Sequence, residues 1–426
     1  MDQSWLLPPS AHELVPPGHL AHFVRDTVRE ALDLSAILAA FDEERGYPPY
    51  RPGMMVALLL YACCRGVYSS RQIARACEER VDFMAVTGLQ RPDFRTVAAF
   101  RRRHLPALAD LFGQVLRLCR AAGLVRLGHV AIGGTKLKAN ASRHKAMSYG
   151  RMAQAEAALA AEVSRWLGEA EAADAEEDAR HGPDRRGDEM PDWVADKARR
   201  LARIRAAKAA LEAEAAAPPA PDGEDGPGPS SGMRRQGRPL RAKGGGPPNR
   251  AQRNFTDPHS RIQPTRDGFM QGYNAQAAVD AESQVIVAQR LVSGPADHPR
   301  LVPLIDQVRD RCGRRPREVS ADAGFCTEAN LAAAQERRIA AYIPSGRARH
   351  GEAKPLAMAM AARLRRAGRR SRYRLRKQTV EPVFGQMKHA RGFRPFLLRG
   401  LDKVRGEWAL LCTAHNLLKL ARAAAA

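Results

Sequence analysis

The sequence lacks the patterns that mark secreted, membrane-spanning and zinc-binding proteins. Its longest apolar run, residues 54–64, is too short to cross a bilayer. The first twenty residues carry prolines and acids where a signal peptide has a basic start and an apolar run. The seven cysteines are scattered, with no CxxC pair and no Cys/His spacing typical of zinc sites. We therefore expect a cytoplasmic protein without membrane contact, in which the cysteines are reduced and buried.

Acidic residues are few relative to basic ones. The chain has 46 Asp and Glu against 69 Lys and Arg, a formal charge of +23. Between Arg363 and Val380 there is no acid at all. This excess predicts a polyanionic partner, with nucleic acid the first candidate, and an enzyme acting on small phosphate compounds would not need it. If this tract contacts phosphates, binding should weaken as salt rises. Its basic residues are Arg363, Arg365, Arg366, Arg369, Arg370, Arg372, Arg374, Arg376 and Lys377.

The first third of the chain has a helical pattern. From residue 18 to about 127, apolar residues recur at helical spacing. Ser69 and Thr96 stand where N-cap residues are expected. The helix predicted after Thr96 carries three consecutive arginines, Arg101, Arg102 and Arg103. Short helices with a turn and a basic face are typical of helix-turn-helix-like modules, so residues 1–126 are expected to form an all-α DNA-binding domain. A plain helical bundle with a solvated basic face is the alternative.

From residue 127 the pattern changes to strands alternating with helices. The run LVRLGHVAIGG predicts a strand, and residues 271–292 predict a hairpin that turns at 280–283. A helix at about 299–312, a strand at 317–325, a helix capped by Thr327 and a strand ending near Pro344 complete a mixed α/β sheet layout. Residues 127–426 would thus form one domain.

Residues 143–253 interrupt this predicted domain. Two Ala-rich helical stretches come first, and we expect them to form a helical hairpin, with DNA binding as the alternative. A tract rich in Pro, Gly, Ser and charge follows and is expected to be disordered.

Two acids lie where catalysis could use them. Asp322 is expected at the end of the strand at 317–325, and Glu381 is expected to open a helix, with Pro382 at an early helical position. Carboxylates on a strand end and on a neighbouring helix can converge on magnesium, which takes hard oxygen ligands and supports phosphoryl transfer. Each acid also has a structural alternative. Asp322 could bond the backbone of its own turn, and Glu381 could complement a helix N-terminus.

Several segments together resemble one protein family. They are the helical stretch from Arg51 to His104, and IGGTKLKANAS, FTDPHSR, GYNAQAAVD, SADAGF and the long C-terminal run beginning EPVFGQMKHARGF. These segments resemble the DDE-type insertion-sequence transposases, whose catalytic core has a ribonuclease H-like fold. The resemblance implies a protein that binds the terminal inverted repeats of its element and the target DNA, then cuts and joins strands with Mg²⁺ or Mn²⁺. It also implies a homodimer on DNA, in association with the nucleoid.

The resemblance assigns roles to individual residues. Asp322 would be the second catalytic acid and Glu381 the third, both as metal ligands. Tyr373, Arg376 and Lys388 would form the basic signature around the third acid, in the pattern Tyr-x2-Arg-x4-Glu-x6-Lys. Arg376 and Lys388 would then bind DNA phosphates near the cut.

The first acid of the family's pattern is missing from this chain. In such transposases the stretch reads Asp-Gly-Thr-Lys, and here Gly133 stands in the place of the aspartate. Two hypotheses follow: a transposase that cuts DNA, or a catalytically dead derivative that only binds it. Asp257 and Asp297 are candidates to replace the first acid. His298 and His415 have no metal-ligand spacing and are expected to be structural. A related nuclease with another role is disfavoured, because both the N-terminal and the C-terminal motifs match transposases.

Overall fold

The computed structural model describes residues 13, 15–41, 50–181, 192–216, 246–265, 268–345 and 355–425. The chain divides into two compact units. The first holds residues 1–140, 273–292 and 296–426, and the second holds residues 141–272 and 293–295. Most of the tract predicted to be disordered, residues 217–245, lies outside the described residues. No helix in the described residues is long and apolar enough to cross a membrane.

Before the first strand, the regular elements of the described residues are helices, as predicted. The longest apolar run forms the buried helix α3, and Ser69 caps α4 by accepting a hydrogen bond from the Gln72 N–H at 3.2 Å. The predicted cap Thr96 is wrong. The Asp93 carboxylate accepts the Arg95 N–H at 2.7 Å, so that helix begins at Phe94. The helices are α1 (Leu20–Glu30), α2 (Ser35–Leu38), α3 (Pro52–Cys64), α4 (Ser70–Glu79), α5 (Val81–Thr87), α6 (Phe94–Arg103) and α7 (Leu105–Ala121).

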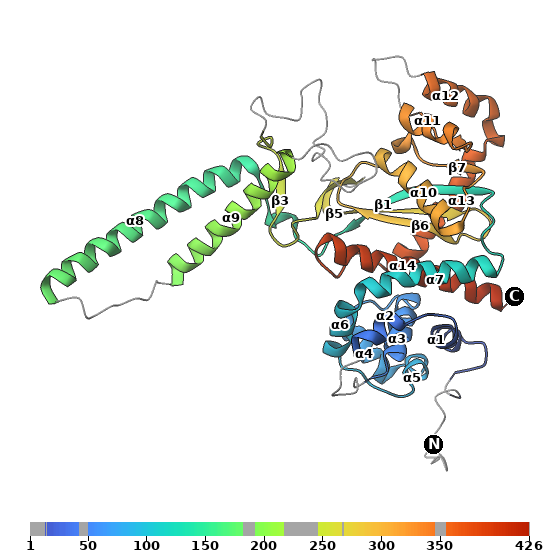
Figure 1. Cartoon of the computed structure of the whole chain (residues 1–426), viewed down its shortest axis with the longest axis horizontal. Coiled ribbons are helices and arrows are strands. Elements are labelled where there is room, and N and C mark those ends of the chain that lie inside the picture. Colours follow the sequence, from blue (N-terminus) through green and yellow to red (C-terminus); the bar gives the residue numbers. More distant parts are fainter. Residues whose placement is uncertain are drawn as a thin grey trace, which may run out of the picture. The chain divides into compact units, whose positions relative to one another are not determined.

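A mixed sheet follows and confirms the predicted α/β class (Figure 1). The strand order is β4-β5-β1-β7-β8, with β6 also paired to β5. β1 pairs with β7 and β7 with β8 in parallel, whereas β5 and β6 form the predicted antiparallel hairpin. β7 ends at Ser320, well short of the predicted strand end at residue 325. The strands are β1 (His129–Lys138), β4 (Arg261–Thr265), β5 (Gly268–Asp280), β6 (Ile286–Val292), β7 (Glu318–Ser320) and β8 (Ala340–Tyr342).

Five further helices belong to the first unit. Thr327 caps one of them as predicted, because its hydroxyl accepts the Asn330 N–H at 3.1 Å. The helices are α10 (Leu301–Cys312), α11 (Glu328–Glu336), α12 (Pro355–Ala367), α13 (Leu375–Gly385) and α14 (Leu401–Ala424).

The last helix, α14, joins the N-terminal helices to the sheet in one core. It lies along α7 (Figure 1), and Gly406 allows the close approach, since a Cβ there would lie 2.6 Å from Leu105 Cγ. On the sheet side, the amide of Asn416 bonds both backbone groups of Ile286, at 2.8 and 2.9 Å. Because Asn416 is fully buried, these two bonds fix α14 against the start of β6.

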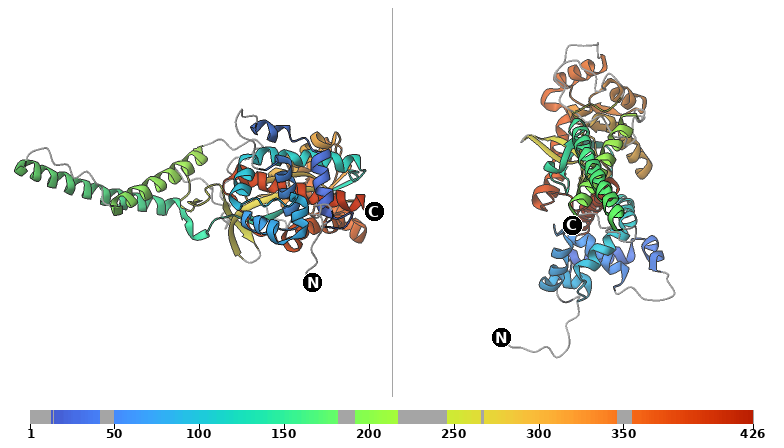
Figure 2. Two further views of the ribbon diagram at one scale, coloured as in Figure 1. Left: turned by 90° about the horizontal axis from the view of Figure 1, so that it is seen from below. Right: turned by 90° about the vertical axis from the view of Figure 1, so that its left-hand side faces the viewer.

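The second unit contains both helices predicted for the interruption. α8 (Tyr149–His181) and α9 (Asp192–Ala216) pack against each other (Figure 2), beside a small antiparallel pair, β2 (Ala146–Ser148) and β3 (Gln252–Asn254). Met152 of α8 and Ile204 and Leu211 of α9 form the centre of a separate hydrophobic cluster. β4 pairs with residues 268–272 of β5 in this unit.

Candidate active site

Strand β1 brings Gly133 beside the turn that carries Asp322. In the parallel pairing of β1 with β7, Ala131 lies opposite Ser320, and continuing this register by two residues places Gly133 level with Asp322. The direction that a side chain would take at Gly133 is filled. A Cβ there would meet the two γ-methyls of Val380 at 3.1 and 3.2 Å and the ring of Phe384 at 3.4 Å. The predicted position of the first acid therefore faces two buried apolar side chains of α13, which must shift by a few tenths of an ångström to admit a Cβ.

Asp322 caps a short turn after β7 and is not part of the strand. Its carboxylate accepts the Gly324 N–H at 3.0 Å, at the start of the 3₁₀ turn Ala323–Phe325. Burial raises the pKa of Asp322, and the nearby Asp297 carboxylate raises it further, while Arg376, the Gly324 N–H and Lys136 act in the opposite direction. This carboxyl therefore takes up a proton more readily than an exposed aspartate.

Glu381 does not open a helix, contrary to the sequence prediction. α13 begins at Leu375, so Glu381 lies well inside it, and Pro382 is an interior proline. An interior proline leaves the carbonyl four residues earlier without its helical donor. Here the side-chain amide of Gln284 donates to that carbonyl, of Gln378, at 2.9 Å. The alternative role of Glu381 at a helix N-terminus is therefore wrong.

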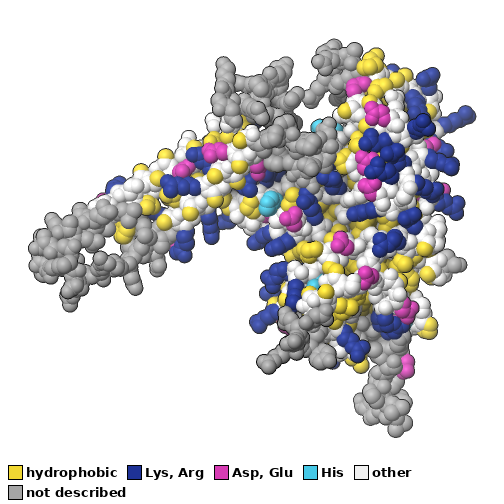
Figure 3. Space-filling view, in the orientation of Figure 1, with side chains coloured by type: hydrophobic (Ala, Val, Ile, Leu, Met, Phe, Trp, Pro, Cys, Tyr) yellow, Lys and Arg dark blue, Asp and Glu magenta, His cyan; other side chains and the backbone are white. Residues whose placement is uncertain are grey.

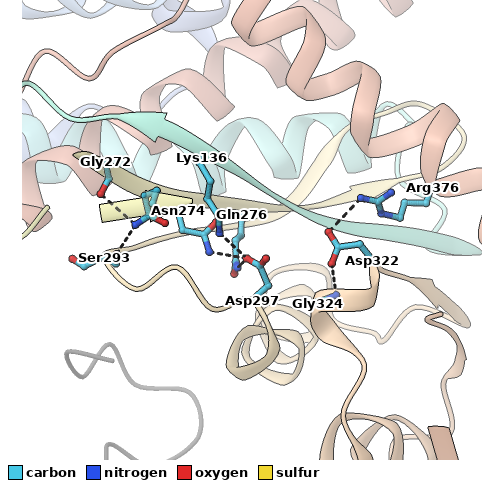
Figure 4. A network of polar contacts seen from close by, with 10 residues as sticks. Lys136, Gly272, Asn274, Gln276, Ser293, Asp297, Asp322, Gly324 and Arg376 are labelled. Carbon is cyan, nitrogen blue, oxygen red and sulfur yellow. Dashed lines mark hydrogen bonds and ion pairs between the residues drawn. The ribbon is translucent and has the colours of Figure 1, made fainter. Parts of the chain in front are cut away.

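Arg376 links the two predicted metal ligands. One terminal nitrogen lies 3.3 Å from Asp322 Oδ2 (Figure 4), and the other donates to Glu381 Oε1 at 2.7 Å. The Arg376 side chain is 14% exposed and the Glu381 side chain 49% exposed, so the guanidinium is more buried than the carboxylate it pairs with. The structure thus gathers Asp322 and Glu381 around one positive charge. Among the described residues, no group of three or more His, Cys, Asp or Glu side chains is arranged to hold a metal ion.

A second polar cluster centres on Asp297, on the other side of β1. Its Oδ1 accepts hydrogen bonds from Asn274 at 2.7 Å and Gln276 at 2.9 Å, and it pairs with Lys136 at 3.3 Å (Figure 4). Burial lowers the pKa of Lys136, against the opposing effect of Asp297 and Asp322. A Cβ on Gly134 would lie 3.0 Å from Asp297 Oδ1, so Gly134, and not Gly133, faces this cluster.

Asp297 and Asp322 approach each other across Gly324. A Cβ on Gly324 would lie 3.0 Å from Asp322 Oδ1 and 3.3 Å from Asp297 Oδ2. Asp297 was predicted as a possible replacement for the first acid, whereas Asn274 and Gln276 were not predicted as site residues. A signal for both was present, because amides at alternate positions of an otherwise apolar strand share one buried face.

The three arginines predicted to contact DNA differ in their surroundings. Arg101 donates to the Tyr68 carbonyl at 2.9 Å and to the Ser70 hydroxyl at 3.2 Å, which ties α6 to the start of α4. Arg103 donates to a backbone carbonyl at 2.7 Å and lies over an aromatic ring. Arg102 is exposed. Two of the three therefore also support the local fold.

The other predicted basic positions lie around α13. Tyr373 is half-buried in the 3₁₀ turn Arg372–Arg374, just before α13. Lys388 is half-buried in the π-helical turn Gln386–Ala390, just after α13, and burial lowers its pKa. Lys and Arg side chains gather over α12 and the segment leading to α13 (Figure 3). The exposed ones include Arg363, Arg365, Arg366, Arg369, Arg370, Arg372 and Arg374.

The remaining candidates make local structural contacts. Asp257 belongs to the second unit, whereas Gly133 and Asp322 belong to the first. The carbonyl of His298 accepts the Asn330 side chain at 2.7 Å. His415 is buried, with one ring nitrogen 2.9 Å from the Gln284 carbonyl and the other 3.3 Å from Arg391.

Comparison with known proteins accounts for most of the chain. A family model described as a transposase DDE domain matches residues 242–417, and one described as a transposase domain, DUF772, matches residues 9–103. The chain belongs to the DDE-type insertion-sequence transposases. The mixed sheet of this transposase is accordingly of the ribonuclease H-like type. Asp322 and Glu381 lie inside the DDE match, whereas Gly133 lies between the two matches. Searches of curated proteins and of solved structures gave no match to this transposase.

Proposed function

We propose that this transposase binds the terminal inverted repeats of its own DNA element but cuts them poorly, because Gly133 supplies no carboxylate. The observation that carries the proposal is the glycine at position 133, where the apolar side chains of Val380 and Phe384, and no carboxylate, lie in the direction that a side chain would take. In this proposal the transposase retains DNA binding, and its rate of strand cutting is reduced. Two element ends must be held together for transposition, so a homodimer on DNA is part of the proposal.

The residues present fit a divalent ion only in part. DDE transposases generally use divalent metals, and Asp322 and Glu381 offer carboxylates that could hold Mg²⁺ or Mn²⁺. With glycine at 133, a site built on these acids would have two carboxylates where the family's pattern has three. When bound, a metal would activate the attacking oxygen and stabilise the leaving one. The chain's own part is to hold the two carboxylates at one place, and Arg376 does this by pairing with both.

DNA binding is supported by the positive charges around the candidate site. The exposed arginines of α12 and the following turn lie next in sequence to Arg376, and Lys388 follows α13 directly. Phosphate contacts depend on basic and polar side chains that can reach the DNA backbone, and they do not depend on the first acid. Loss of that acid therefore removes chemistry without removing the surface proposed to bind the element ends.

Strand cleavage of DNA carrying the element's own ends tests the proposal. The unchanged chain is compared with Gly133→Asp and with Gly133→Asp/Val380→Ala, in Mg²⁺ or Mn²⁺, and Glu381→Ala on the restored protein is the control. We expect tight end binding by all proteins and efficient cutting only after Gly133→Asp, abolished by Glu381→Ala. Equal cutting by the unchanged chain would refute the proposal.

A second candidate is a fully active transposase in which Asp297 replaces the first acid. The approach of Asp297 Oδ2 to Asp322 Oδ1 across Gly324 favours it. Against it, Asp297 Oδ1 already carries two amide donors and the Lys136 ammonium. This candidate predicts that the unchanged chain cuts and that Asp297→Asn abolishes cutting while the chain still binds the element ends.

A further inference from the structure

The second unit contains a pocket whose charges are not balanced by neighbouring acids. It has a volume of about 540 Å³ and lies between the start of α8, the first half of α9, and the residues at 144–147 and 255 beside β2 and β3. Lys145, Arg151, Arg199, Arg200 and Arg203 line it, with one acid, Asp196. We call this the hairpin pocket.

Several charged residues elsewhere on α8 and α9 form acid–base pairs. Glu156 pairs with Arg205 at 3.1 Å and with Lys208 at 2.9 Å. Glu162 pairs with Lys197 at 2.6 Å. Inside the hairpin pocket, by contrast, Asp196 pairs only with Arg199 in the described structure, at 2.9 Å.

Four cations of the hairpin pocket, Lys145, Arg151, Arg200 and Arg203, form no ion pair with any acid in the described part of the chain. All four are exposed. Positive charges gathered without counter-charges repel one another, so the arrangement is stabilised when an anion binds.

The floor of the hairpin pocket is apolar. Ile204 belongs to the core between α8 and α9, and Met147 and the half-buried Phe255 pack against that core. A simple inorganic anion gains nothing from such a floor. A sugar–phosphate backbone gains from both parts, with phosphates on the charged rim and the deoxyribose rings against the apolar floor.

We propose that the hairpin pocket binds the sugar–phosphate backbone of DNA, as a contact additional to those around α13 and in the N-terminal helices. The proposal rests on the proposed function in so far as this transposase binds DNA. It gives the interruption between β1 and β4 a role, because the helical hairpin carries a phosphate-binding pocket on its own small core. Because the contact is to the backbone, it acts on any duplex sequence.

The chain offers a matched pair of double variants. Arg200→Gln/Arg203→Gln removes two unpaired charges of the hairpin pocket, and Arg205→Gln/Lys208→Gln removes two acid-paired charges from the same helix. Both variants change the net charge equally. Full-length proteins are titrated with a duplex of the element end and with an unrelated duplex of equal length, from 50 to 200 mM salt. Circular dichroism and thermal unfolding verify that each variant folds, and Arg151→Gln repeats the test from α8.

The expected result is weaker binding of both duplexes by the pocket variant alone. Each phosphate contact contributes about 0.9 to the slope of log K against log salt, so two lost contacts lower the slope by about 1.8. The advantage of the unchanged chain then shrinks about twelvefold between 50 and 200 mM salt. Equal losses in both double variants, or no loss in either, would overturn the pocket while leaving the proposed function intact. The second of these outcomes would favour an acidic protein segment as occupant. Failure of the unchanged chain to bind any DNA would instead refute the proposed function itself.

Discussion

Introducing an aspartate at Gly133 should restore a catalytic acid at a measurable cost in stability. The new Cβ would lie 3.1–3.4 Å from Val380 and Phe384, tighter than most Cβ contacts in proteins. Forcing extra atoms into a packed core costs about 1–3 kcal/mol. The carboxylate adds a further penalty, because it would be introduced near Asp322, whose pKa burial and Asp297 already raise. We therefore expect Gly133→Asp to lower the free energy of unfolding by at least the packing cost.

Urea unfolding of four proteins separates packing from charge. Gly133→Ala adds only the Cβ, and its backbone is compatible, since Gly133 is not among the glycines with positive φ. Val380→Ala removes the two methyl groups that the Cβ would meet. The double variant Gly133→Ala/Val380→Ala should be more stable than the sum of the single effects predicts, by about 0.5–3 kcal/mol. Additive effects would show that Val380 does not close the position.

Metal should stabilise the aspartate variant more than the unchanged chain. A ligand at one hundred times its dissociation constant stabilises the folded state by about 2.7 kcal/mol. Saturating Mn²⁺ should therefore recover much of the loss in Gly133→Asp, and Glu381→Ala should cancel the recovery. If Mn²⁺ shifts the unchanged chain and the variant equally, position 133 does not contribute to a metal site, and our reasoning about the missing acid is wrong.

Three further predictions concern the surrounding residues. Lys388→Ala should weaken end binding and lower the salt slope by about 0.9, and unchanged binding with a full slope in a filter-binding titration would refute its phosphate role. Because the Arg376 guanidinium is paired with both Asp322 and Glu381, the predicted phosphate role of Arg376 is replaced by support of these carboxylates, and Arg376→Ala should lower the salt slope less than Lys388→Ala does. Burial lowers the pKa of His415 to about 3, so the unfolded chain binds an extra proton below about pH 6.5 and stability falls on acidification, by up to about 1.4 kcal/mol per pH unit. Urea midpoints at pH 7 and pH 5 should differ less in His415→Gln than in the unchanged chain. Asp297→Asn should destabilise the protein, because Lys136 loses its carboxylate partner, and Asp297→Asn/Lys136→Met should recover part of the loss, whereas an unrecovered loss would point to the amide contacts alone.

Local patterns in the sequence predicted elements that local contacts determine. The hairpin of β5 and β6 and the caps Ser69 and Thr327 were correct, because turn residues and capping side chains act within a few positions of themselves. Thr96 was wrong because Asp93 is an equally good cap residue three positions earlier, and its carboxylate reaches the Arg95 N–H. Both Asp93 and Thr96 are residue types favoured at an N-cap, and the sequence pattern alone does not show which of them caps the helix.

Long-range contacts explain the errors at the candidate site. Pro382 predicts a helix that begins just before it, because proline is favoured in the first turn of a helix. In the fold, Gln284 satisfies the carbonyl that Pro382 leaves free, and it comes from a segment about a hundred residues earlier. The bridge from Arg376 to Asp322 likewise joins residues far apart in sequence. No pattern within α13 could indicate either contact.

The tight apolar contacts around Gly133 bear on how activity could return. A cluster of carboxylates without metal is strained by repulsion, so losing one acid relieves the fold while it impairs the chemistry. In this chain Val380 and Phe384 lie within 3.4 Å of where a Cβ on residue 133 would be. Restoring the acid alone must then overcome both the repulsion and the apolar packing. We therefore expect Gly133→Asp/Val380→Ala to cut faster than Gly133→Asp alone, because the smaller neighbour leaves room for the carboxylate to turn toward Asp322. Equal rates in a single-turnover nicking assay would mean that α13 accommodates the aspartate without the Val380→Ala change, and that packing at this position does not limit cutting.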